Sequence, residues 1–118
     1  MKTMNTSRLD ATALRVDFAR EVAAPALAKA FGARRIWLFG SVAKGEAEQF
    51  SDIDLLVDAG VGMGAKERLF KAAEVIESLD DIPCGVDVIV LTEDEIQSKS
   101  GISSIKSVLA ERKVIYEC

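Results

Sequence analysis

The chain has 118 residues, of which 49% are hydrophobic and 29% are charged, proportions typical of one soluble globular domain. Its formal net charge of −4 argues against a general binder of DNA or RNA, because such proteins usually carry an excess of basic residues. The chain contains no histidine, which excludes histidine-ligated zinc sites and imidazole bases, so any acid–base or metal chemistry must use carboxylates.

An amphipathic helix is predicted near the N-terminus. Residues 1–8 are polar and are expected to form a flexible tail, which leaves residues 9–118 as the folded domain. Asp10 is suited to cap the helix. Pro25 predicts a kink or break just before it, because proline lacks a backbone donor and clashes with the preceding turn. Gly32 is suited to end the helix. The apolar stripe of this helix comprises Leu14, Phe18, Val22, Leu27 and Phe31.

Three apolar runs predict the central strands of a sheet. Residues 35–39 form the first strand, and apolar side chains on both of its faces are typical of a covered sheet. Residues 41–44 are expected to form a short helical turn, and residues 45–49 a polar loop. Residues 51–58 form the second predicted strand and residues 86–91 the third.

Three further helices and a last strand are predicted. If the last two helices are counted as one helical segment, the predicted order is α-β-β-α-β-α-β. Residues 66–79 predict a helix whose apolar face favours core packing over partner binding. A capping box at Thr92–Glu95 begins a short helix. Residues 103–111 predict a final helix, and residues 113–116 a strand at the sheet edge. The predicted inward faces are Leu69, Ala72, Ala73, Ile76 and Leu79 in the first of these helices, and Ile105, Val108 and Leu109 in the last.

The cysteines and the hydropathy pattern indicate a cytoplasmic protein. Cys84 and Cys118 are the two cysteines, and we see no signal peptide before them, so reduced thiols are expected. No apolar run approaches the ~20 residues that a membrane-spanning helix needs. We therefore expect no association with a membrane.

Three aspartates are the strongest candidates for a functional site. Asp52 and Asp54 lie two residues apart, so on a strand they share one face, about 7 Å apart at their Cα atoms. Asp87 lies inside the third apolar run, where a buried carboxylate is costly unless it is paired, hydrogen-bonded or bound to a cation. If the two strands are adjacent, the three carboxylates suit Mg²⁺, which prefers oxygen ligands. The alternatives are a solvated strand edge for the first two acids and a salt bridge for Asp87.

A candidate phosphate-binding turn precedes these acids. Gly40 follows the first strand, and glycine lets the backbone turn sharply and approach a ligand closely. Ser41 adds a hydroxyl group and, if a helical turn begins there, backbone N–H groups suited to phosphate. Lys44 lies on the same turn and could neutralise a phosphate oxygen. Without the aspartates, an ordinary strand-to-helix turn with a capping serine would be the preferred interpretation.

Together, these residues resemble the signature of the DNA polymerase beta-like nucleotidyltransferase superfamily. That signature is Gly-Ser, a spacer, Asp-x-Asp and a third aspartate on a later strand, which here are Gly40-Ser41, Asp52-Ile53-Asp54 and Asp87. The segments FGSVAKGEAEQFSDIDLLV and VDVIVL are most similar to the minimal nucleotidyltransferases (MNT proteins), which are small single-domain proteins. The resemblance covers residues 36–91, and one departure is Lys44, where the family often has arginine.

The resemblance implies an α/β (α+β) single domain of the polymerase-beta type, with a small mixed sheet and helices packed mainly on one face. It also implies a Mg²⁺-dependent nucleotidyltransferase with ATP as the donor and two metal ions. The implied metal-binding and catalytic residues are Asp52, Asp54 and Asp87, and the implied nucleotide-binding residues are Gly40, Ser41 and Lys44.

The resemblance further implies an acceptor outside the chain. MNT proteins are often paired with a HEPN-domain protein in a toxin–antitoxin system, and they can modify a tyrosine of the HEPN toxin. Because 118 residues leave little chain to grip a large substrate, a partner or second subunit is expected to complete the cleft in a homo- or hetero-oligomer. No direct contact with nucleic acid is expected. The alternatives are a non-catalytic antitoxin that masks its partner sterically and a small-molecule nucleotidyltransferase.

Overall fold

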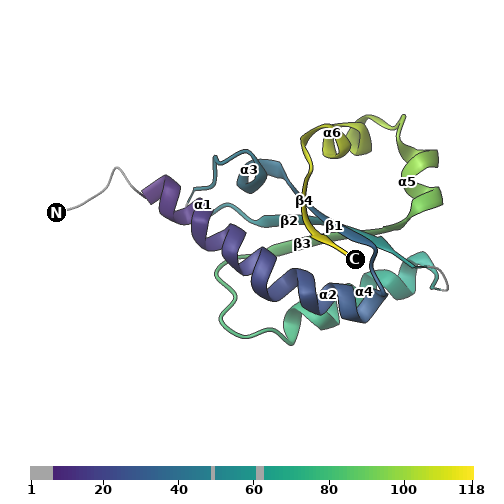
Figure 1. The fold of residues 1–118 in the computed structure, drawn as a ribbon, viewed down its shortest axis with the longest axis horizontal. Helices are drawn as coiled ribbons and strands as arrows, with labels where there is room; N and C mark the ends of the chain where they lie inside the picture. Colours follow the sequence, from purple (N-terminus) through teal and green to yellow (C-terminus); the bar gives the residue numbers. More distant parts are fainter. Residues whose placement is uncertain (1–6, 49, 61–62) are drawn as a thin grey trace.

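A mixed four-stranded sheet forms the centre of the computed structural model, which describes residues 7–48, 50–60 and 63–118 (Figure 1). The strands lie in the order β3-β2-β1-β4. β1 (Arg35–Phe39) runs antiparallel to both β2 (Ile53–Ala59) and β4 (Lys113–Glu117), whereas β3 (Val86–Thr92) runs parallel to β2. The predicted mixed sheet is therefore confirmed, with β3 and β4 at its two edges.

The N-terminal helix adapts to its proline without ending. α1 (Ser7–Phe18) passes into a π-helical segment, η2 (Ala19–Ala23), and then into α2 (Ala24–Phe31), so the three form one long rod in Figure 1. A π-helical turn shifts the hydrogen-bond pattern by one residue, and such turns are a known cause of helix irregularity. A kink or break was predicted near Ala24. The helix does not break there; instead, the π-helical segment ends at Ala23 and α2 begins at Ala24. Gly32 ends the helix with φ 59°, as predicted.

Helices cover both faces of the sheet, but unequally. The larger core cluster contains Leu27, Ile36 and Leu55 and lies between the sheet and the helices α1, η2, α2 and α4 (Ala65–Glu77). The smaller cluster joins the other face to α5 (Glu93–Lys99) and α6 (Ser103–Glu111), with Trp37 and Leu56 at its centre. Helices packed mainly on one face were predicted, and the unequal size of the two clusters confirms this arrangement.

Several details of the predicted helices are wrong. The first helix begins at Ser7, so Asp10 lies in its first turn and does not cap it. The predicted tail over residues 1–8 otherwise falls on residues outside the described ranges. Leu14, Val22 and Leu69 were assigned to buried stripes, but they are 57%, 38% and 64% exposed. The reason is that a short sheet covers only part of each helix, and α4 packs beside the edge strand β3.

The last helix packs as predicted. In α6, Val108 is buried and both Ile105 and Leu109 pack against the smaller cluster. Neither Cys84 nor Cys118 forms a disulfide. Among the described residues, no helix combines the length and the apolar character that crossing a bilayer requires.

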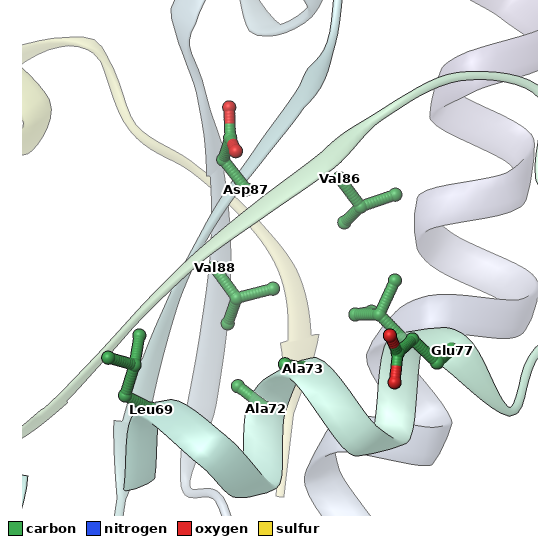
Figure 2. Close-up of a pocket in the computed structure, with 8 residues that line it drawn as sticks. Leu69, Ala72, Ala73, Glu77, Val86, Asp87 and Val88 are labelled. Carbon is green, nitrogen blue, oxygen red and sulfur yellow. The ribbon is translucent and has the colours of Figure 1, made fainter. Parts of the chain in front are cut away.

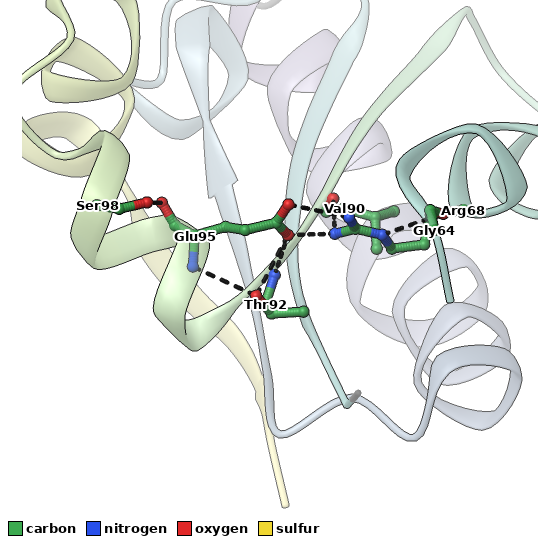
Figure 3. A network of polar contacts seen from close by, with 6 residues as sticks. All are labelled: Gly64, Arg68, Val90, Thr92, Glu95 and Ser98. Carbon is green, nitrogen blue, oxygen red and sulfur yellow. Dashed lines mark hydrogen bonds and ion pairs between the residues drawn. The ribbon is translucent and has the colours of Figure 1, made fainter. Parts of the chain in front are cut away.

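A polar network ties α4, β3 and α5 together at one end of the sheet (Figure 3). Arg68 on α4 is buried and donates hydrogen bonds to the backbone oxygen of Val90 (3.1 Å) and to both carboxylate oxygens of Glu95. Glu95 also accepts a hydrogen bond from the backbone N–H of Thr92 (2.9 Å), which completes the predicted capping box. The hydrogen bonds from Arg68, followed by that from Thr92, hold the pKa of Glu95 at about 2.

We expect Arg68→Met to lower the free energy of unfolding by about 2 kcal/mol, because it leaves Glu95 without its charged partner. Arg35→Met is the matched control: it removes the exposed pair between Arg35 and Glu117 and should cost less than ~1 kcal/mol. Chemical denaturation at neutral pH measures both. Equal losses in the two variants would contradict a special role for the buried network.

The same network predicts a pH dependence. The folded pKa of Glu95 is about 2 and its ordinary value is 4.5, so its stabilisation is complete above pH 4.5 and is lost as the pH falls toward 2. The difference in unfolding free energy between the wild type and Arg68→Met should therefore shrink over this interval. A constant difference from pH 6 to pH 2 would contradict the assignment.

Candidate active site

Asp54 and Asp87 are direct neighbours on two adjacent parallel strands. The register between β2 and β3 pairs the Cα of Asp54 with that of Asp87. Val86 and Val88 belong to the larger core, so the alternating side chain of Asp87 projects from the opposite face of the sheet. Figure 2 shows this directly, because Asp87 points away from α4 while both valines point toward it. Asp54 projects from that same face by the same alternation, since Ile53 and Leu55 belong to the larger core.

Gly40 presses the backbone against Asp54. β1 ends at Phe39, which pairs with Asp54, and the chain turns at Gly40 into a single helical turn, α3 (Gly40–Ala43). Gly40 has φ 77°, which favours glycine, and a Cβ added there would lie 2.3 Å from Oδ2 of Asp54. Only glycine therefore fits this position without displacing the carboxylate. The predicted glycine turn is present, and what it approaches is an acid of the site.

The charge on Asp54 is unfavourable in this position. Burial, then the negative charge of Asp87, then that of Asp52, raise the pKa of Asp54 from 3.8 to about 6. The other two predicted acids therefore both lie close enough to Asp54 to disfavour its charge. At neutral pH Asp54 is mostly ionised despite this cost, so the site concentrates negative charge that a bound cation would relieve.

Asp52 precedes the strand and does not belong to it. β2 begins at Ile53, whose N–H donates a hydrogen bond to the backbone oxygen of Gly85 (2.9 Å), and Asp52 is exposed. A Cβ on Gly85 would lie 2.6 Å from Oδ1 of Asp52, so this carboxylate rests against the chain that leads into β3. In the described part of the chain, no three acidic or cysteine side chains converge closely enough to surround a metal ion by themselves.

The donor chemistry nevertheless fits a hard divalent cation. The carboxylates supply oxygen ligands. Burial first, and then the charges of Asp87 and Asp52, raise the pKa of Asp54, and a bound cation would offset both effects. Because Mg²⁺ keeps several waters and binds substrate phosphates, it does not need a complete cage of protein ligands. Asp52, Asp54 and Asp87 stay the predicted ligands.

Ser41 and Lys44 are less closely tied to these acids. Ser41 lies half-buried in α3, directly after Gly40. The ammonium group of Lys44, at the end of that turn, lies 3.4 Å from a carboxylate oxygen of Glu111 on α6, and both side chains are partly exposed. Exposed pairs of this kind contribute little free energy, so Lys44 can leave Glu111 for another anion.

Two residues of α1 support the site and were missed by the sequence analysis. Arg15 is buried and donates a hydrogen bond from Nε to the backbone oxygen of Ser51 (2.8 Å), directly before Asp52. The hydroxyl of Thr12 accepts a hydrogen bond from the backbone N–H of Ala47 (3.2 Å). The available signal was the position of Arg15, three residues before Phe18 and therefore on the buried side of the helix.

Comparison with known proteins gives a consistent result. Residues 21–116 match the family described as the nucleotidyltransferase domain. The chain is 38% identical over 90 residues to the protein adenylyltransferase MntA of Thermococcus cleftensis, and this match covers 76% of the chain and 80% of MntA.

Two solved structures have a similar fold. One is a crystal structure described as a candidate nucleotidyltransferase of Sulfolobus solfataricus, with a TM-score of 0.68 and 24% identity, covering 98% of this chain and 90% of that one. The other belongs to a toxin–antitoxin with AMP-PNP, with a TM-score of 0.50 and 19% identity, covering 91% and 72%. At these identities the likeness concerns the fold alone.

We predict that Asp54→Asn stabilises the metal-free protein at pH 7, by on the order of 1 kcal/mol after allowance for partial solvent exposure. Because the folded pKa of about 6 lies above 3.8, the ionised carboxylate costs stability in full above pH 6, and the cost disappears as the pH falls to 3.8. Thermal denaturation at pH 7 and at pH 4 without divalent cations measures this. Asp54→Asn should gain stability over the wild type at pH 7 and not at pH 4. A variant that is less stable at pH 7 would contradict the prediction.

Substitution of two glycines with similar backbone angles can distinguish the cost of backbone strain from the cost of steric crowding. Gly40 and Gly45 have φ 77° and 75°, but a Cβ on Gly45 meets nothing within 4 Å. Gly45→Ala should cost about 1 kcal/mol of unfolding free energy for backbone strain, and Gly40→Ala about 1–2 kcal/mol more for displacing Asp54. The NMR chemical shift of the Asp54 carboxyl group should change in Gly40→Ala but not in Gly45→Ala. Equal costs and an unchanged Asp54 in both variants would disprove the close approach.

Proposed function

The chain belongs to the nucleotidyltransferase domain family, and on that premise we propose that it transfers AMP from ATP to a hydroxyl group of a partner protein. The nucleotidyl transfer itself follows from the family. The donor, the metal and the acceptor are the parts that we propose, and with ATP as donor the reaction belongs in the cytoplasm. The observation that carries the proposal is the pairing of Asp54 with Asp87 under the glycine turn at Gly40.

The residues divide into two roles. Asp54 lies against Gly40, and Asp52 lies against Gly85 at the entrance to β3. These two acids would hold Mg²⁺ against the triphosphate. Gly40 and Ser41 would bind the triphosphate through the turn after β1, with Lys44 released from Glu111 to contact a phosphate oxygen. Two Mg²⁺ ions bound at Asp52, Asp54 and Asp87 would neutralise the charge that develops on the reacting phosphate.

Asp87 is the residue placed best to meet the acceptor. It is exposed and lies on the edge strand β3, whereas Asp54 is half-buried on the inner strand β2. In the proposed step, the acceptor oxygen attacks the α-phosphorus and its proton passes to Asp87. The bond from the α-phosphorus to the bridging oxygen breaks, and pyrophosphate leaves with that oxygen. The protein contributes mainly by positioning and by neutralising charge.

The proposed acceptor is a tyrosine of a HEPN-domain toxin, so that the chain acts as an antitoxin. The similarity to MntA, described as a protein adenylyltransferase, and the fold shared with a toxin–antitoxin structure both support a protein acceptor. The chain's own site also supports it, because Asp87 is exposed on the edge strand β3, where a large acceptor can reach it.

We expect Asp54→Asn and Asp87→Asn each to lower transfer of label from α-labelled ATP to the co-purified partner by about 100-fold or more. Each substitution removes a proposed ligand while keeping the shape of the side chain. Circular dichroism and thermal denaturation should show both variants folded.

Asp80→Asn is the matched control, because Asp80 is also an exposed aspartate but lies in the turn after α4. It should retain wild-type transfer. If the Asp54 and Asp87 variants label the partner as well as Asp80→Asn does, the catalytic assignment is wrong. If they lose transfer and still protect cells from the partner as the wild type does, the antitoxin effect is steric.

A further inference from the structure

The outer edge of β3 is open next to the proposed active site. β3 is an edge strand of mostly apolar sequence, Val86–Thr92, and most of its side chains remain half-exposed. It carries no proline or lysine, the residues that usually protect such an edge from pairing. An open apolar edge of this length is a template for another strand.

The hydrogen-bonding groups that face outward on this edge can be assigned. Gly85 directs its backbone oxygen to Ile53 of β2, and Val90 directs its backbone oxygen the other way, to Arg68. Backbone groups of successive residues in a strand point alternately to its two sides, so Val86 and Val88 also point outward. Arg68 donates a hydrogen bond to the outward-facing oxygen of Val90, near one end of the strand. The N–H and C=O groups of Val86 and Val88, on either side of Asp87, face the open side.

A groove runs along this edge, between β3 and α4. Its first part is a cavity of about 340 Å³ whose lining includes Val86, Val88 and the small side chains of Ala72 and Ala73 (Figure 2). Its second part, of about 330 Å³, continues past Leu69 toward Val90 and ends at Arg68. Leu69 lines both cavities and is 64% exposed, so the apolar surface beside the groove is accessible to solvent.

We propose that the acceptor segment of the partner protein binds as a fifth strand along β3, with its reactive hydroxyl residue opposite Asp87. This inference rests on the proposed function. Side chains of paired strands that lie opposite each other project from the same face of the sheet. The residue opposite Asp87 therefore points to the face of the acids, and its two neighbours, opposite Val86 and Val88, point into the groove.

The groove determines the chemistry of that segment. Its walls of valine and alanine side chains accept apolar side chains of moderate size on both sides of the hydroxyl residue. Glu77, which lines the first part of the groove from α4, is acidic, so basic residues should flank the apolar ones. The expected acceptor is an extended segment of the pattern basic, apolar, tyrosine, apolar, basic.

The test uses two synthetic peptides with the full chain. The first is acetyl-KKVYVK-amide, and the second has the same sequence with N-methyl groups on its tyrosine and both valines, which removes the backbone donors and keeps every side chain. With α-labelled ATP and Mg²⁺, the first should be labelled on its tyrosine about tenfold faster or more, at equal concentration. It should also slow amide hydrogen exchange at Val86 and Val88. Equal labelling of the two peptides, or unprotected valine amides, would overturn the proposal.

Substitutions in the protein, rather than in the peptide, provide a second test of the same groove. Ala73→Trp fills the groove from the exposed face of α4, and Ala13→Trp places the same side chain on an exposed position of α1. We expect Ala73→Trp to raise KM for the peptide and for the partner about tenfold while KM for ATP stays unchanged. Ala13→Trp should behave as the wild type. Equal behaviour of the two variants would contradict docking on this edge.

The outcomes separate this inference from the proposed function. If the partner protein is labelled and Ala73→Trp leaves the KM for the partner unchanged, the proposed function is supported and the proposed binding along β3 is wrong. If neither peptide nor partner is labelled, the proposed function itself fails. If sedimentation shows a dimer that Ala73→Trp dissociates, the groove binds a second copy of this chain, which also overturns the proposal.

Discussion

The register between β2 and β3 is the constraint on which the site depends. A shift of either strand by one residue would turn its aspartate toward the larger core and its core valine or leucine side chains toward the opposite face. Packing of the apolar side chains on β2, most of which are buried, therefore also fixes the two carboxylates side by side. The hydrophobic core offsets an electrostatic arrangement that would not persist on its own, and such strain is common at functional sites.

Elements far from the acids hold the surrounding backbone. Arg15 reaches from α1 to the residue before Asp52, and Gly40 brings the end of β1 against Asp54. At the other end of β3, Arg68 joins α4 to the strand and to α5. Both arginines are buried and make hydrogen bonds to backbone oxygens. They therefore stabilise the positions of the strand ends as well as the fold.

The two halves of the site differ in how complete they are. The half at Gly40 and Asp54 is enclosed by β1, β2 and the turn of α3. The half at Asp87 lies on the edge strand β3, and the groove beside α4 runs along the opposite face of that strand. This asymmetry agrees with a small nucleotide bound within one chain and a large acceptor supplied from outside it. It also gives a physical reason why an apolar face such as that of Leu69 can stay uncovered in the free protein.

The sequence by itself determined most of the local elements and singled out the candidate residues of the site. Apolar runs predicted the strands and Gly32 predicted the end of the N-terminal helix, because these features depend on neighbours along the chain. The spacing of Asp52 and Asp54 predicted a shared strand face, but β2 begins only at Ile53. Only the tertiary structure decided which strands are adjacent, and hence that Asp87 lies beside Asp54. It also decided that Arg15 supports the site and that Leu69 is exposed. Burial and charge repulsion depend on contacts between distant segments, and periodicity along one helix cannot show where the sheet beneath it ends.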